Sequence, residues 1–250
     1  MRQTIVITDL TQMKSGNYVC IAGINESGQC IRPVAEDRER GIPKDLLFYK
    51  SKPVVCPRAR VEFDFYTVKV ELPHVEDHGF DPNHIVNKGF YSSTEWEDIL
   101  RNSSYATVDT IYDGLLEEHK WVRPGAKTRS IATLSRVIVV NVQLPEWDGK
   151  LKYRLSFKDD TGNVFDCPVS DLTFRELCYK RIKRDGRPRL TVSNELTNLL
   201  KNTHRVYLRL GLARPFRVAP TTEPRCYLQV TGIYTFPDYL QGKTSADFLV

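Results

Sequence analysis

The sequence predicts a mainly β protein with inserted helices, and three observations support this fold class. Apolar and polar residues alternate, or apolar residues gather in short runs, far more often than they recur at helical spacing. In residues 151–158, four apolar residues alternate strictly with four polar ones. Turn-forming sequences such as residues 159–163 separate these segments. Of the 250 residues, 41% are hydrophobic and 27% are charged, which suits a protein with a substantial core and excludes disordered and fibrous classes.

The elements of the second half come in a definite order. Ser170 is the expected N-cap of a helix that Asp185 and Gly186 end. The order β-β-β-α-(α)-β-β is that of an OB fold, a five-stranded barrel with a helix between its third and fourth strands. The predicted strands are residues 133–143, 151–158, 164–167, 204–210 and 226–234, and the predicted helices are residues 170–184 and a shorter segment from Ser193.

The first half contains a similar set of strands, at residues 4–8, 17–23, 29–32 and 60–70. In the last of these the apolar phase changes after Phe65, which predicts a bulge or a sharp bend of the kind that closes a barrel. Similar turn sequences occur in the two halves, and the question whether the halves arose by an internal duplication stays open.

Residues 72–127, which have a different composition, join the two halves and are expected to form a partly helical insertion in or after the first barrel. Ser92 and Glu95 form a capping-box pattern before one helix, and a second helix is expected around residues 111–119. We therefore predict two domains. Residues 1–128 form a first OB-like barrel with the insertion, and residues 129–250 form a second, basic OB-like barrel.

The charge is divided unevenly between these halves. Residues 1–128 hold 16 Lys and Arg against 19 Asp and Glu, and residues 129–250 hold 20 against 12, so that the net charges are −3 and +8. A basic half predicts a polyanionic partner, because phosphate binding by a basic face releases condensed counterions. The six cysteines form no C-x-x-C pair, which argues against a structural zinc site and a disulfide scaffold. Because no long apolar stretch or signal peptide is evident, we expect a cytoplasmic protein without a membrane partner.

Four segments of the sequence resemble a known family. They are Ile5-Val-Ile-Thr-Asp-Leu10, Pro73-His-Val-Glu-Asp77, Arg209-Leu-Gly-Leu-Ala-Arg-Pro-Phe216 and Gly232-Ile-Tyr-Thr-Phe-Pro-Asp-Tyr239. Together they are similar to the prokaryotic dual OB-domain family, which is encoded near bacterial conflict and anti-phage genes and is presumed to bind nucleic acid. The resemblance implies two OB-like barrels and a role in recognition. Most relatives have an aromatic residue after the Glu-Asp pair, where this chain has His78, so the role of that segment stays open.

Cations and tyrosines are expected on the outer face of the second barrel, because alternation sends every second side chain of a strand outward. Single-strand binding needs this combination, since the cations contact phosphates and the rings stack on bases. The alternative is an ordinary solvated strand face. The candidate residues are Lys152, Arg154, Lys158, Arg205, Tyr207, Arg209 and Tyr227.

Two further groups of cations are candidates for phosphate contact. Residues 180–189 hold six cations, although the dipole at a helix C-terminus also favours cations. The loop between the fourth and fifth strands often borders the binding groove of an OB fold, and a packing role between the barrels is the alternative there. The candidates are Lys180, Arg181, Lys183, Arg184, Arg187 and Arg189 in the run, and Arg214 and Arg217 in the loop.

One cluster has the residue types that ligate metals: His74, Asp77, His78 and His84. The first two histidines have helical i, i+4 spacing, but the prolines and the glycine around them favour a loop. We expect a polar loop without a metal ion.

These patterns favour a non-catalytic protein that recognises single-stranded or structured RNA or DNA and needs no cofactor. The resemblance suggests an anti-phage defence system, in which a partner protein would supply catalysis. No phosphate-loop, dinucleotide-binding, serine-hydrolase or zinc-protease motif is found in the sequence. The alternatives are a protein-interaction module, a metal-dependent nuclease that uses the histidine cluster, and a protein that binds a small nucleotide in the mouth of a barrel.

Overall fold

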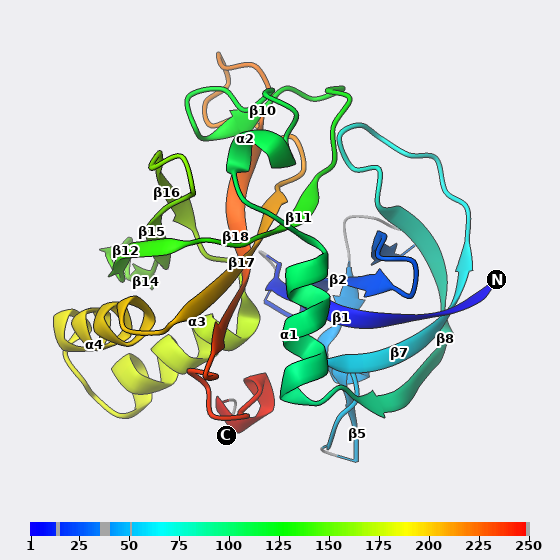
Figure 1. Cartoon of the computed structure of the whole chain (residues 1–250), viewed down its shortest axis with the longest axis horizontal. Helices are drawn as coiled ribbons and strands as arrows, with labels where there is room; N and C mark the ends of the chain where they lie inside the picture. Colours follow the sequence, from blue (N-terminus) through cyan, green and yellow to red (C-terminus); the bar gives the residue numbers. More distant parts are fainter. Residues whose placement is uncertain (14–15, 36–40, 51, 249–250) are drawn as a thin grey trace.

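The structure, a computed structural model, describes residues 1–13, 16–35, 41–50 and 52–248. It consists mainly of β-strands, which form two barrel-like units with helix α1 (Ser93–Asn102) between them (Figure 1). The predicted fold class, a mainly β protein with two OB-like units and inserted helices, is confirmed.

The first barrel is a closed ring of five strands. β1 pairs with β2 and β7, β2 pairs with β3, and β8 joins β7 to β3, so that the strand order is that of an OB fold. Alternate side chains such as Val61 and Phe63 fill the ring. The five strands are β1 (Arg2–Gln12), β2 (Tyr18–Asn25), β3 (Cys30–Val34), β7 (Ala59–Tyr66) and β8 (Asp77–Phe90). Between β3 and β7 lie β4 (Ile42–Pro43), η1 (Lys44–Leu47), β5 (Phe48–Tyr49) and β6 (Lys52–Pro53).

The change of apolar phase after Phe65 coincides with two features of β7. Its pairing with β8 shifts between Phe63 and Phe65, which is the predicted irregularity. The strand itself ends at Tyr66, so the expected continuation to residue 70 is wrong.

The segment expected as a partly helical insertion, residues 72–127, contains more β-strand than the sequence indicated. β8, which begins at Asp77, is the fifth strand of the first barrel and not part of a loop. The capping box is confirmed, because Ser92 and Glu95 exchange hydrogen bonds at the start of α1. The second helix, α2, lies earlier than expected, at Val108–Ile111, where Thr107 caps it. The segment also contains β9 (Ser104–Tyr105) and β10 (Trp121–Val122).

These later elements pack against the second barrel. β9 pairs with β11 (Ile131–Leu134), β10 pairs with β18 (Cys226–Phe236), and Val108 and Ile111 belong to the second core. The boundary between residues 128 and 129 stays a prediction.

The second barrel consists of two sheets. One has the order β10-β18-β17-β11-β9 and the other the order β12-β15-β16, and a parallel bridge between Val169 and Val230 joins β18 to the end of β16. The strand expected at residues 133–143 is split into β11 and β12, because Arg136 between them has a left-handed φ of 54°. The remaining strands are β12 (Ile138–Gln143), β13 (Glu146–Trp147), β14 (Lys150–Leu151), β15 (Arg154–Lys158), β16 (Val164–Pro168) and β17 (Arg205–Leu212).

The helices of this barrel begin at other residues than predicted. Asp171, rather than Ser170, caps α3 (Leu172–Tyr179), because its carboxylate accepts from the Thr173 and Phe174 amides. The π-helical turn η2 (Lys180–Arg184) extends α3 to the predicted end. The next helix, α4 (Arg189–Lys201), begins after Pro188, and Ser193 lies inside it and donates to the carbonyl of Val142 instead of capping. A short turn, η3 (Ser245–Phe248), follows β18. No helix among the described residues is long and apolar enough to cross a membrane.

Asp171 gives this barrel an expected pH dependence. Burial raises the pKa of Asp171 to about 7, although the amides of Phe174, Ile233 and Thr173 donate to its carboxylate and oppose the rise. The pKa in the unfolded chain is about 3.9. The folded state therefore favours the protonated acid, and Asp171 should lower the stability progressively from about pH 4 to about pH 7.

Urea unfolding of the wild type and of Asp171→Asn at pH 5 and pH 7.5 measures this effect. The difference in unfolding free energy between the two proteins should move against the wild type by about 1.4 kcal/mol for each pKa unit crossed. A difference that stays constant, or moves in favour of the wild type, would contradict the raised pKa.

Candidate nucleic-acid interface

Strand β15 has the predicted alternation. Leu155 and Phe157 are fully buried in the second core, whereas Arg154 and Lys158 are half-buried on the other side. Lys152 is exposed, but it lies in the connection before the strand. Tyr153 is buried as expected, with the guanidinium of Arg175 4.8 Å from its ring centre.

Strand β17 also alternates, but its second face is not open to solvent. Tyr207 is 5% exposed and Arg209 is 1% exposed. Tyr207 packs with α1 and with Val6 of the first barrel in a separate apolar cluster between the barrels. Only Arg205 at the start of the strand is exposed, and it pairs with Glu97 at 2.8 Å. The prediction that Tyr207 and Arg209 face solvent is therefore wrong, because the first barrel and α1 cover that face.

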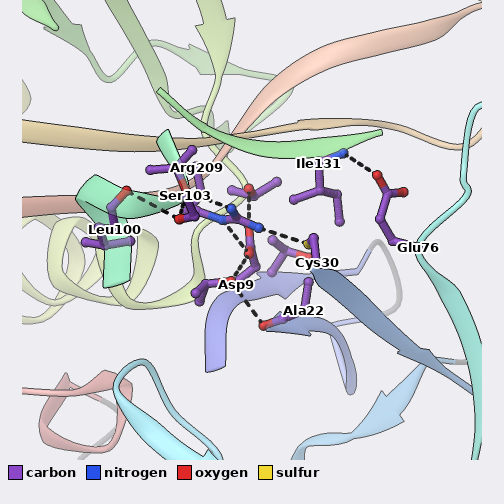
Figure 2. Close-up of polar contacts among 12 residues, drawn as sticks. Asp9, Ala22, Cys30, Glu76, Leu100, Ser103, Ile131 and Arg209 are labelled. Atoms are coloured by element: carbon purple, nitrogen blue, oxygen red, sulfur yellow. Dashed lines mark hydrogen bonds and ion pairs between the residues drawn. The ribbon is translucent and has the colours of Figure 1, made fainter. Parts of the chain in front are cut away.

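Arg209 is the centre of a buried polar network between the barrels (Figure 2). Its Nε donates to the Asp9 carboxylate at 2.8 Å, and its two terminal nitrogens donate to the Thr133 hydroxyl at 2.9 Å and to the Cys30 sulfur at 3.2 Å. Thr231 donates to the other oxygen of Asp9. Burial alone would lower the pKa of Arg209, but Asp9 and Cys30 outweigh it and the pKa is raised, so the guanidinium stays charged.

A second set of contacts links the barrels about the start of β8. The buried carboxylate of Glu76 accepts from the amide of Ser130 at 2.8 Å and from its hydroxyl at 2.6 Å. The neighbouring Asp77 accepts from Arg32 of its own barrel at 2.6 Å and from Arg214 of the second barrel at 2.7 Å. Asp77 is therefore a buried carboxylate shared by two arginines.

An open groove of about 740 Å³ lies on the second barrel, between the β15–β16 pair and the first residues of β18. It brings together three of the predicted binding residues, Arg154, Arg214 and Tyr227. The strand pair and the loop after the fourth strand form the face through which OB folds bind oligonucleotides. The groove therefore lies where the fold class expects a ligand. The remaining lining includes residues of the segment before β10, of β16, of the loop between β17 and β18, and of β18: Glu118, His119, Lys120, Asp166, Pro168, Phe216 and Gln229.

Two rings in the groove form a hydrophobic surface. Phe216, which is 41% exposed, lies 4.8 Å from the Tyr227 ring centre with the planes tilted by 42°. Paired backbone hydrogen bonds between Phe216 and Arg225 close the loop, and Arg225 lies 4.0 Å over the ring of Trp121. A loop held in this way keeps Phe216 in place. The prediction from the sequence assigned Phe216 no ligand contact, because an aromatic residue in a loop is equally consistent with burial.

The cations of the groove differ in how they are held. Arg154 makes a forked pair with Asp166, in which its Nη2 donates to one carboxylate oxygen at 2.8 Å and its Nε to the other at 3.2 Å, and Arg214 is bound to Asp77. Lys120 is exposed, and its backbone carbonyl accepts from the Leu228 amide at 2.8 Å, which fixes its position beside β18.

The cations of residues 180–189 lie on η2, in the connection after it and at the start of α4, and they do not line the groove. Most of them have acidic partners close by: Lys180 pairs with Asp185, Arg181 and Arg187 with Glu195, and Lys183 and Arg189 with Glu146. Arg184 donates to the carbonyl of Phe248 at 2.8 Å. Arg217 is exposed and donates to the carbonyl of Thr222 in its own loop. Phosphate contact by these residues stays a prediction.

The candidate metal ligands are separated by the fold. His84 pairs with Glu62 at 3.2 Å, and His78 packs against the ring of Phe65 while its Nδ1 lies 3.0 Å from the carbonyl of Glu76. His74 is buried, and Asp77 binds two arginines. Within the described part of the chain, no three His, Cys, Asp or Glu residues are grouped so that they could hold a metal ion. The expectation that all of these residues lie in one loop is wrong for Asp77, His78 and His84, which are in β8.

The fold and this groove define the class of the protein as a tandem OB-fold protein. A model of the family of dual OB-containing domains matches residues 3–233, and the chain belongs to this family. A comparison with curated proteins finds no match.

The four segments that carry the resemblance have a common location. They contribute Asp9, Asp77, Arg209, Arg214 and Tyr234, all of which make contacts between the barrels. Tyr234, for example, donates to the carbonyl of Thr8 at 2.8 Å. In this chain the segments therefore join the two barrels.

Asp9→Asn tests the importance of the network. The substitution leaves Arg209 buried without its counter-charge, which should cost roughly 3–5 kcal/mol of unfolding free energy. The exposed pair of Arg136 with Asp160, at 2.9 Å, provides the control, because Arg136→Ala should cost less than about 1 kcal/mol. Equal losses in the two variants, measured by urea unfolding, would show that the buried pair has no special role.

Proposed function

We propose that this protein binds single-stranded or unpaired nucleic acid through the groove of the second barrel and does not itself catalyse a reaction. The observation that carries the proposal is the position of Arg154, Arg214 and Tyr227 in one open groove on the face that OB folds use. The rings of Phe216 and Tyr227 would stack on bases, and the cations would contact the backbone phosphates.

Duplex nucleic acid fits this surface less well. Stacking on Phe216 or Tyr227 needs bases whose faces are free, and in a duplex they are already stacked. The net charge of +8 on residues 129–250 adds a long-range attraction for any polyanion but does not distinguish single strands from duplexes.

The aromatic residues give the sharpest test of this proposal. Tyr227→Ala and Phe216→Ala should each weaken binding of labelled single-stranded DNA or RNA by about 1–3 kcal/mol, or roughly 5- to 150-fold. Fluorescence anisotropy at about 50 and 200 mM salt measures this, and affinity should also fall steeply with salt. Tyr49→Ala, at an exposed tyrosine of the first barrel, is the matched control. Wild-type protein that binds no strand at the lower salt would refute the proposal.

We further propose that the protein acts in the cytoplasm as a recognition component of an anti-phage system whose catalysis resides in a partner. The support is its membership of the dual OB family, together with a groove that offers binding groups. RNA and DNA both remain candidate ligands.

A second candidate function, a protein-interaction module, is favoured by one surface. Trp147 at the tip of the β13–β14 hairpin is 71% exposed, and Leu190 at the start of α4 is 72% exposed. Glu146 of the hairpin pairs with Arg189 at the start of α4 and with Lys183 of η2. Exposed Trp and Leu beside cations suit an acidic protein partner with apolar side chains.

One experiment separates the two candidates. Cells that carry the system with Tyr227→Ala or with Trp147→Ala and Leu190→Ala combined are challenged with phage, and nucleic-acid binding by each purified variant is measured in parallel. Loss of protection with Tyr227→Ala alone favours nucleic-acid recognition. Loss of protection with the combined Trp147→Ala and Leu190→Ala variant, while its nucleic-acid binding stays intact, favours the interaction module.

A further inference from the structure

We infer that the two barrels build a single binding site together, in which Asp77 of the first barrel positions Arg214 of the second for a phosphate of the bound strand. The inference rests on the proposed function and specifies it. It makes the first barrel a part of the site and predicts that each protein chain binds one nucleic-acid strand. It requires that the ligand-binding face of the first barrel is closed and that Arg214 extends from the interface into the groove.

The face of the first barrel that corresponds to the groove is covered. In the OB strand order, β2 and β3 correspond to β15 and β16 of the second barrel. Cys20 and Arg32 on these strands line a small cavity of about 110 Å³, which residues of β17 and β18, such as Gly211 and Thr231, close from the other side. Cys30 of β3 accepts from Arg209. A nucleic-acid strand can therefore reach this face of the first barrel only if the two barrels separate.

Arg214 belongs to both the interface and the groove. Its side chain is 38% exposed, and it lines the groove on one side and the cavity between the barrels on the other. One terminal nitrogen donates to Asp77 at 2.7 Å. Asp77 is held in turn by Arg32 at 2.6 Å and by parallel pairing of its strand with β3.

The charges of this cluster favour an additional anion. Two guanidinium groups share the one carboxylate of Asp77, and the charge of the buried Glu76 acts on Arg32 as well. Arg214, at the end of the groove, therefore shares its carboxylate with an arginine that is compensated from two sides. Burial lowers the pKa of Arg214 and the nearby Arg32 lowers it further, while Asp77 opposes the change and compensates it only in part. A phosphate oxygen would supply the missing charge, and a guanidinium fixed in orientation loses little side-chain entropy on binding.

The test compares three variants with the wild type by anisotropy over a range of salt concentrations, using labelled single strands of about eight nucleotides. Arg214→Gln should weaken binding roughly tenfold and reduce the slope of log affinity against log salt by about 0.7, the value for one phosphate contact on a single strand. Arg214→Lys keeps the charge but lacks the planar guanidinium that can bind Asp77 with one nitrogen and a phosphate with another, so it should lose affinity with little change in the slope.

Asp77→Asn combined with Arg32→Gln keeps the net charge of the protein and keeps Arg at position 214. It removes the charged carboxylate that positions Arg214 and the arginine that holds this carboxylate. It should weaken binding nearly as much as Arg214→Gln. Arg136→Gln, at an exposed and ion-paired arginine of the second half that does not line the groove, is the control and should bind like the wild type. Circular dichroism checks that each variant is folded. If the double variant does not fold, Arg214→Lys decides the question, because undiminished binding by that variant overturns the inference.

The stoichiometry gives an independent result. Titration at concentrations well above the dissociation constant should saturate at one short strand per chain. Saturation at two strands, or wild-type affinity in the folded double variant, would overturn the inference while the proposed function stands. Absence of any binding by the wild type would instead refute the proposed function, so the two failures are distinguishable.

Discussion

The bond between Arg209 and Asp9 determines how the rest of the molecule is arranged. A guanidinium that is 1% exposed is stable only with a carboxylate beside it, and that carboxylate comes from the other barrel, 200 residues earlier in the chain. Thr133, Thr231 and Cys30 satisfy the remaining polar groups, so β1, β3, β11, β17 and β18 meet at one point. Because these groups are costly to bury unless all are paired, they specify one relative position of the barrels.

This arrangement gives the two barrels different roles although they share a strand order. The first barrel is closed by hydrogen bonds all round, and the outer faces of its β2 and β3 pack against its neighbour. The second barrel is joined between its third and fifth strands by the bridge of Val169 and Val230 and by the bonds that the amide and hydroxyl of Ser170 donate to the Val230 carbonyl, and the groove lies beside this junction. The first barrel thus has its β2–β3 face covered, and the second leaves the corresponding face open to solvent.

The distribution of charge follows the same division. The excess of cations in the second half does not form one basic stripe, because acids such as Glu146 and Glu195 neutralise much of the run on η2 and α4. In the groove, Arg154 is likewise held by Asp166, whereas Arg214 shares its carboxylate with Arg32. Pairing makes a cation less available to phosphates but better oriented, so the local geometry of each arginine matters more than the net charge.

Several local features could be predicted from the sequence. The alternation of β15, the capping box of α1 and the OB order of the second half follow from interactions within a few residues or between neighbouring strands. Alternation also placed Arg209 and Tyr207 on the face opposite the core, and both are on that face. It could not show that another barrel covers them, because a strand's periodicity records which side a residue is on and not what lies against that side. Only the tertiary structure, which brings Asp9 to Arg209 and Asp77 to Arg214, decided which polar residues join the barrels and which face the groove.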